Sequence, residues 1–263
     1  MERNQIPLAP VDMVMPPIYH WVLIASFAML LGVSIWILKE VQRTRSAIPA
    51  LIVVGAAVAS LTECLWDIQG AIWYPQFGHT PLYRIFNISV PLWDLPGYAC
   101  YLGGQGYWFY RRLRKGMTTS TFWRFYVFCW LTDIALEVPV LQLGIYVYYG
   151  PQPFNFLGLP LWQAMGNSLI PIFIGSAIYS WREMLTGVKV LLVIPLVITS
   201  LVFALTGVGW PVWLAMNSGG GYAATYPAAA IAMALSLLLA YMVSGKVCSL
   251  SPQISTNLAA RTD

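Results

Sequence analysis

Charged residues are scarce in this sequence. Only 9% of its 263 residues are Asp, Glu, Lys or Arg, whereas 59% are hydrophobic. Soluble domains contain roughly 25% charged residues, so this composition excludes an ordinary soluble domain. The net charge of +4 gives no reason to expect a nucleic-acid partner. The chain is therefore predicted to be an integral, multi-pass membrane protein whose main partner is the lipid bilayer.

Potential metal ligands are also few. The two histidines, His20 and His79, lie far apart, and the cysteines lack the close spacing of metal ligands. The sequence has no aspartate-rich motif of the kind that binds a diphosphate. These absences predict that the protein uses no metal and no cofactor, and they argue against chemistry that begins with ionisation of a diphosphate.

Long apolar runs dominate what is present. Each run is about long enough to cross a bilayer as a helix, and none shows the short alternating pattern of a membrane β-barrel. We therefore predict an all-α bundle of seven transmembrane helices in a single domain, 1–263, with a short cytoplasmic tail over 246–263. The predicted spans are about 19–38, 48–68, 91–110, 121–145, 160–181, 188–209 and 223–244.

Positive residues gather in alternate loops. All 14 Lys and Arg except Arg3 and Arg84 fall on one predicted side of the membrane. Cytoplasmic loops are enriched in Lys and Arg, so the N-terminus is predicted outside and the C-terminus in the cytoplasm. An odd number of spans likewise requires the two termini to lie on opposite sides of the membrane. The host membrane would be the bacterial cytoplasmic membrane or the endoplasmic reticulum.

Several carboxyl groups lie inside the predicted helices, all in their outer halves. A charge inside the bilayer is costly, and Arg84 is the one basic residue that could reach this depth, so pairing cannot neutralise every carboxylate. A protonated acid beside an ionised carboxylate can perform acid–base chemistry at neutral pH. The alternative is that these groups join helices through hydrogen bonds or reach the wet interface. The candidate catalytic residues are Glu63, Asp67, Asp94, Asp133 and Glu137.

Two parts of the chain are similar to each other. "TECLWDIQ" (62–69) matches "TDIALEVP" (132–139), and "PLWDLPG" (91–97) matches "PLWQAMG" (160–166). The two matches are offset by 70 and 69 residues respectively (132 − 62 and 160 − 91). We infer that the second and third spans and the fourth and fifth spans are copies of one helical hairpin.

Aromatic and neutral polar residues occur at the level of the acids. Aromatic rings stabilise cations where water is excluded, although many of these rings would belong to the interfacial aromatic belt. The amides could orient a substrate oxygen or simply join helices by hydrogen bonds. Pro139 could kink its span and widen a pocket beside Glu137. The candidate substrate-binding residues are Trp66, Trp93, Tyr98, Trp130, Gln142, Trp162, Gln163 and Asn167.

With an acid late in its second span, in "TECLWD", the chain resembles the small seven-span terpene cyclases. These are the fungal meroterpenoid and indole-diterpene cyclases and the bacterial relatives that cyclise prenylated indoles. The resemblance implies that Glu63 protonates an epoxide or alkene of a polyprenyl chain. The family's second key acid lies in the last span, which has none here, so Asp133 and Glu137 would take that role.

The expected function is a membrane-embedded cyclase or isomerase that protonates an isoprenoid, lipid-like substrate. A sterol-type double-bond isomerase would use the same chemistry. A proton-coupled carrier or channel would use the acids as a relay, but no acid lies in the inner half of any span. A retinal-binding receptor is disfavoured, since Lys246 is only at the end of the last span. A structural assembly factor stays an alternative.

Overall fold

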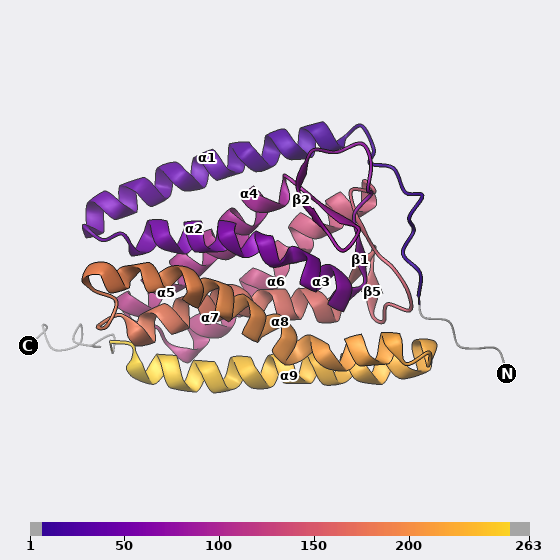
Figure 1. Cartoon of the computed structure of the whole chain (residues 1–263). Coiled ribbons are helices and arrows are strands. Elements are labelled where there is room, and N and C mark those ends of the chain that lie inside the picture. Colours follow the sequence, from indigo (N-terminus) through magenta and orange to yellow (C-terminus); the bar gives the residue numbers. More distant parts are fainter. Residues whose placement is uncertain (1–6, 253–263) are drawn as a thin grey trace, which may run out of the picture.

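The computed structural model describes residues 7–252 of the chain as a bundle of long helices with small strands at one end (Figure 1). Among these residues, six helices are long and apolar enough to cross a membrane. This confirms the prediction of a helical, multi-pass membrane architecture. The six are Tyr19–Thr44, Ile48–Gly70, Thr119–Gln142, Leu161–Trp181, Gly187–Asn217 and Gly221–Leu250.

Some of these helices are built from segments. The second comprises α2 (Ile48–Ala59), a short 3-10 segment η1 (Ser60–Thr62) and α3 (Glu63–Gly70). The fifth comprises the 3-10 segment η3 (Gly187–Leu192) and α8 (Val193–Asn217). The others are regular along their length: α1 (Tyr19–Thr44), α6 (Thr119–Gln142), α7 (Leu161–Trp181) and α9 (Gly221–Leu250).

The predicted span 91–110 does not form one long regular helix. It consists of α4 (Asp94–Tyr98), the π-helical segment η2 (Ala99–Gly104) and α5 (Gln105–Lys115). Proline and glycine weaken regular helical hydrogen bonding, and this stretch contains "LPGYACYLGG". A π-helical segment of this kind is frequently found at functional sites.

The helix ends extend beyond several predicted spans. The last helix, α9, continues to Leu250, so the first residues of the predicted cytoplasmic tail, from 246 to 250, are helical. No proline lies between Lys246 and Leu250, so the helix can continue past its apolar part. The remainder of the predicted tail, 253–263, lies outside the described residues.

The helix α7 lies at the centre of the bundle, where it packs against α5, α6, α8 and α9 (Figure 1). Its contact with α5 is close because glycines face each other across it. A Cβ atom at Gly175 would lie 2.8 Å from the backbone nitrogen of Tyr110, and one at Gly106 would lie 2.8 Å from Cγ2 of Ile174. Small residues at such contacts are typical of helix packing in membranes.

Three two-stranded antiparallel sheets lie at one end of the bundle. β2 (Pro81–Ile85) pairs with β3 (Ile88–Pro91), and β5 (Asn155–Phe156) pairs with β6 (Leu159–Pro160). The third sheet joins segments far apart in the sequence. Its strands are β1 (Ile72–Trp73), which follows α3, and β4 (Val147–Tyr148), which follows α6.

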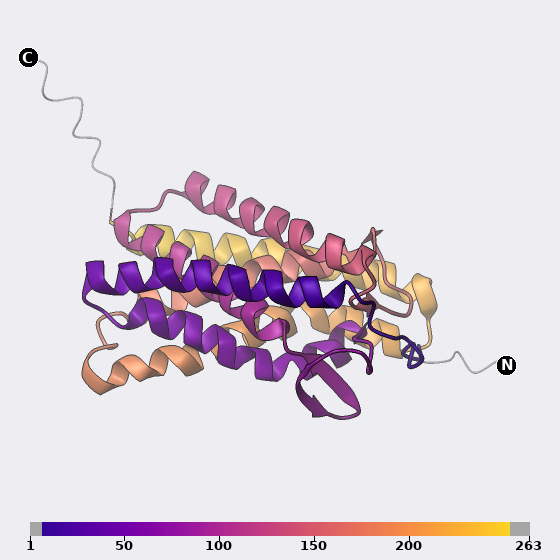
Figure 2. The same cartoon turned by 90° about the horizontal axis from the view of Figure 1, so that it is seen from above.

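The two ends of the bundle differ in composition. The end that carries the sheets is here called the strand end. The opposite end, called the basic end, holds the C-termini of α1, α5, α7 and α9 (Figures 1 and 2). The Lys and Arg residues at the basic end are Lys39, Arg43, Arg45, Arg111, Arg112, Arg114, Lys115, Arg124, Arg182, Lys189 and Lys246.

Candidate functional site

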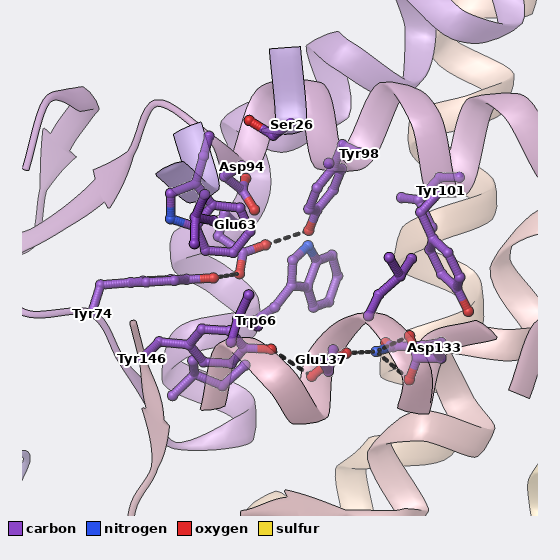
Figure 3. A pocket seen from close by; sticks show the side chains of 18 of the residues that line it. Ser26, Glu63, Trp66, Tyr74, Asp94, Tyr98, Tyr101, Asp133, Glu137 and Tyr146 are labelled. Carbon is purple, nitrogen blue, oxygen red and sulfur yellow. Dashed lines mark hydrogen bonds between the residues drawn. The ribbon is translucent and has the colours of Figure 1, made fainter. Parts of the chain in front are cut away.

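A cavity of about 450 Å³ lies in the half of the bundle nearer the strand end. Side chains from α1, α3, α4, η2, α6 and α7 line it, together with tyrosines from the loops around β1 and β4 (Figure 3). This size is typical of sites for small molecules. Most of its wall is apolar or aromatic, and its carboxyl groups are Glu63, Asp94, Asp133 and Glu137.

Glu63 begins α3, directly after the 3-10 segment, and points into the cavity (Figure 3). Its side chain is only 6% exposed. The hydroxyl of Tyr74 donates to Oε1 at 2.9 Å, and the hydroxyl of Tyr98 donates to Oε2. Both carboxyl oxygens therefore have a phenolic partner, which fixes the orientation of this acid.

Glu137 lies on the opposite wall, on α6, where three donors surround it. The hydroxyls of Tyr146 and Tyr148 donate to Oε2 at 2.7 and 3.0 Å. The side-chain amide of Asn167 donates to Oε1 at 2.8 Å. Hydrogen bonds from several donors are what an ionised carboxylate needs in an apolar surrounding.

Asn167 also links Glu137 to the neighbouring acid. Its Nδ2 atom lies 3.2 and 3.4 Å from the two carboxyl oxygens of Asp133. Gln163, one turn earlier on α7, donates to Oδ1 of Asn167 at 3.3 Å. The two amides therefore hold the carboxyl groups of α6 in place, and Gln163 and Asn167 both face the cavity.

Asp94 and Asp67 complete an acidic group around Glu63. Asp94 lines the cavity beside Glu63 (Figure 3), close enough for the two charges to interact. Within residues 7–252, Oδ2 of Asp94 and both carboxyl oxygens of Asp67 are buried without a hydrogen-bond partner. A buried charge without partners is strongly unfavourable, so some of these three acids must be protonated.

The pairing of β1 with β4 brings the tyrosines to these acids. The register places Ile72 opposite Tyr148 and Trp73 opposite Val147. Tyr146 and Tyr148 are two residues apart, so both hydroxyls reach the same side of the extended segment. The loops after α3 and α6 thus meet over the cavity and supply partners to an acid on each wall.

These tyrosines remain protonated near neutral pH. Burial, followed by the nearby charge of Glu137, raises the pKa of Tyr146 and of Tyr148 well above the ordinary value. Burial and the charge of Glu63 have the same effect on the pKa of Tyr74. The three hydroxyls therefore act as hydrogen-bond donors.

Aromatic rings form a continuous wall beside the carboxyl groups. The ring of Trp93 stacks on that of Tyr146, with centroids 6.1 Å apart and an interplanar angle of 27°. Tyr74 contacts both of these rings, with centroid distances of 6.1 and 5.3 Å. The π faces of such a wall can stabilise a positive charge that develops on a bound molecule.

The structure brings most of the predicted site residues together. The predicted residues that line the cavity are Glu63, Trp66, Asp94, Trp93, Tyr98, Asp133, Glu137, Gln163 and Asn167. Pro139 lies inside α6 and also lines the cavity, beside Glu137.

The other predicted residues lie elsewhere. Asp67 is buried next to the cavity without lining it. Gln142 is exposed and donates to the backbone carbonyl of Leu157 at 2.8 Å, so it holds a loop. Trp130 does not line the cavity but packs against the apolar cluster that includes the cavity residues Tyr74 and Tyr146. Trp162 is buried in a cluster with residues of α8 and α9.

Several cavity residues were not among the predicted site residues. Tyr74, Tyr146 and Tyr148 look like members of an interfacial aromatic belt in the sequence. The signal that could have identified Tyr146 and Tyr148 is their spacing, two residues apart in the loop that follows the span with Asp133 and Glu137. Ser26 and the other residues of α1 that line the cavity carry no such signal.

No group of three or more His, Cys, Asp or Glu side chains within residues 7–252 is arranged to hold a metal ion. The chain matches no protein-family model, no curated protein and no solved structure. Its possible function therefore follows from the chemistry of the cavity.

Proposed function

We propose that this protein is a membrane-embedded isomerase or cyclase of an unsaturated, isoprenoid-like lipid, acting by proton transfer from and to carboxyl groups. The observation that carries the proposal is an apolar, aromatic-walled cavity with carboxyl groups on opposite walls. Glu63 and Asp94 lie on one side, and Glu137, with its three donors, lies on the other.

The rim of the cavity supports an apolar substrate. Met29 on α1, together with Leu136 and Leu143 at α6, lines the cavity and is exposed on the outside of the bundle. In a membrane this outside surface faces lipid. A hydrophobic molecule dissolved in the bilayer could therefore enter between α1 and α6 without crossing water.

The proposed reaction begins with the acids around Glu63. The pair formed by Glu63 and Asp94 carries one proton and transfers it to one carbon of an alkene, whose π electrons form the new C–H bond. The other carbon becomes a cation, which the rings of Trp93 and Tyr146 stabilise. Protonation of an epoxide oxygen would open a C–O bond and give an equivalent cation.

The reaction ends with loss of a proton. A second double bond of the same molecule can attack the cation and form a ring, and Glu137 then accepts a proton from a neighbouring carbon. Glu137 then releases its proton to solvent, and the pair of acids takes up a proton from solvent before the next cycle. Substrate and product then have the same elemental composition, as isomerisation and cyclisation require.

Two further features support the sequence-based predictions of a repeat and of orientation. Tyr98 and Asn167 occupy matching positions in the two similar segments, and each donates to the first acid of its own segment, Glu63 or Asp133.

The basic end carries all but one of the described Lys and Arg residues, Arg84 being the exception. We propose that this end faces the cytoplasm and that the cavity lies in the outer half of the membrane.

The test is a search for products of unchanged mass. Membranes that contain the protein are incubated with a panel of prenylated, epoxidised and sterol-type lipids, and products are separated chromatographically. We expect a new isomer with the wild type and none with the Glu63→Gln, Glu137→Gln double variant. Glu183→Gln is the matched control, because Glu183 is an exposed carboxylate at the basic end.

Different outcomes separate the alternatives. Identical products from the wild type and the double variant across the panel would contradict the proposal. Acid-dependent uptake of a solute into vesicles, without an isomer product, would favour a carrier. The buried apolar cluster around α2, α5 and α7, which fills the basic half of the bundle, is a further reason to prefer an enzyme, since a carrier needs a path through it.

A further inference from the structure

A second pocket lies at the basic end, separate from the acidic cavity. Its volume is about 320 Å³, and it lies between the C-terminus of α1, the first turn of α2 and the last turns of α5. The packed residues Ile37, Ile52 and Val53, which belong to the main apolar cluster, are placed on α1 and α2 between the two sites. The residues that line the pocket are Arg43, Thr44, Ser46, Ile48, Pro49, Tyr107, Tyr110, Arg111, Arg114 and Lys115.

A buried carboxylate organises two of the cations in this pocket. Glu40, only 6% exposed, accepts a hydrogen bond from Nη2 of Arg43 at 2.6 Å and forms an ion pair with Nη1 of Arg111 at 3.2 Å. The hydroxyl of Tyr107 donates to the same carboxylate at 2.5 Å. These contacts hold two guanidinium groups on the pocket wall, so their remaining N–H groups are oriented before any ligand binds.

The pocket carries an excess of positive charge. Four cationic side chains line it, and Glu40 beneath them supplies one negative charge, which leaves three positive charges (4 − 1). In the part of the chain that the structure describes, neither Arg114 nor Lys115 pairs with a carboxylate.

We propose that this pocket binds a phosphate monoester, either on a lipid headgroup or as a free phosphate compound. Arg side chains match phosphate oxygens with two parallel hydrogen bonds, and a monoester carries about −1.5 to −2 charges at neutral pH. An excess of three positive charges suits such a group better than a singly charged diester. Clusters of Lys and Arg at the cytoplasmic membrane surface are a recognised site for anionic headgroups.

The test measures binding, and it does not depend on the proposed enzymatic activity. Purified full-length protein in nanodiscs of zwitterionic lipid is titrated calorimetrically with dihexanoyl phosphatidic acid, dihexanoyl phosphatidylglycerol and inorganic phosphate. We expect phosphatidic acid to bind more tightly than phosphatidylglycerol. Each cation near the surface contributes about fivefold to affinity, so the Arg114→Gln, Lys115→Gln double variant should bind about 25-fold more weakly.

The matched control removes the same charges outside the pocket. Arg112 lies on α5 next to the pocket residues but contacts the ring of Trp108, 6.0 Å from its centroid, and Lys189 lies in η3. The Arg112→Gln, Lys189→Gln variant should change affinity by less than about twofold if the pocket, and not the general surface charge, binds the ligand. A thermal melt of each variant checks that it is folded.

The arms of the experiment distinguish the source of the phosphate. Tight binding of phosphatidic acid but not of inorganic phosphate identifies a lipid headgroup, whereas comparable binding of both identifies a soluble phosphate. Either result supports the site if the pocket variant alone loses binding. Equal losses in the pocket and control variants, or no binding of any probe, would overturn the proposal.

Discussion

The tyrosines that donate to Glu137 offer a test that needs no substrate. Tyr146→Phe and Tyr148→Phe each remove one hydroxyl and keep the ring, so the stack of Tyr146 on Trp93 is retained. The lost contacts measure 2.7 and 3.0 Å. A hydrogen bond to a charged group contributes about 1.5–3 kcal/mol, so the double variant should lose about 3–6 kcal/mol of unfolding free energy.

The measurement is reversible unfolding in mixed micelles titrated with a denaturing detergent. Tyr126→Phe is the control, because its hydroxyl donates to the neutral backbone carbonyl of Met165 at 3.3 Å. A neutral hydrogen bond of this kind contributes only about 0.5–1.5 kcal/mol. Each substitution at Tyr146 or Tyr148 should therefore cost more than the control.

A double-mutant cycle with Glu137→Gln tests whether Glu137 is ionised. If it is a carboxylate, the cost of Tyr146→Phe should fall by about 0.5–3 kcal/mol in the Glu137→Gln background, because the donor no longer stabilises a charge. The reasoning is refuted if Tyr146→Phe costs no more than Tyr126→Phe, or if its cost is the same with and without the carboxylate.

Three further predictions concern pH and packing. The pKa of Tyr146 and of Tyr148 is raised in the folded protein, so above about pH 10 the unfolded chain releases protons that the folded protein keeps. The free energy of unfolding should therefore fall as pH rises, and tyrosinate absorbance should appear together with unfolding. Burial and the nearby Arg84 lower the pKa of His79, so the contribution of His79 to stability is lost as pH falls below about 6.5. The free energy of unfolding of a His79→Gln variant should not show this decrease. Gly175→Ala should cost about 1–3 kcal/mol in detergent unfolding because its Cβ would lie 2.8 Å from a backbone nitrogen, whereas Gly245→Ala, with open space around it, should cost nothing; equal effects would contradict the packing.

The sequence predicts the long helices well because hydropathy over about 20 residues is a strong signal. The stretch 91–110 shows the limit of that signal. Its apolar content predicts a span, but its regularity depends on local backbone interactions around Pro96, Gly103 and Gly104, which hydropathy does not describe. The resulting π-helical segment is where Tyr101 and Leu102 reach the cavity.

The sequence predicts that the acids lie at a similar depth in the membrane, because the direction of each span and the position of the acid within it determine that depth. Which acids share a cavity depends on helix rotation. On α7, Gln163, Asn167 and Ile170 line the cavity, so Trp162, about 100° away around the helix, faces α8 and α9 instead. The contribution of Tyr148 depends on the pairing of two loops more than 70 residues apart, which no local pattern indicates.

The central claim is that a carboxyl proton is added to carbon in an apolar cavity. Once an alkene substrate is found, the direct measurement is the reaction in D₂O, because the carboxyl groups exchange with solvent before turnover. The product should have the elemental composition of the substrate with one non-exchangeable deuterium on carbon, and the Glu63→Gln, Glu137→Gln variant should form none. A product that forms without deuterium would contradict this account.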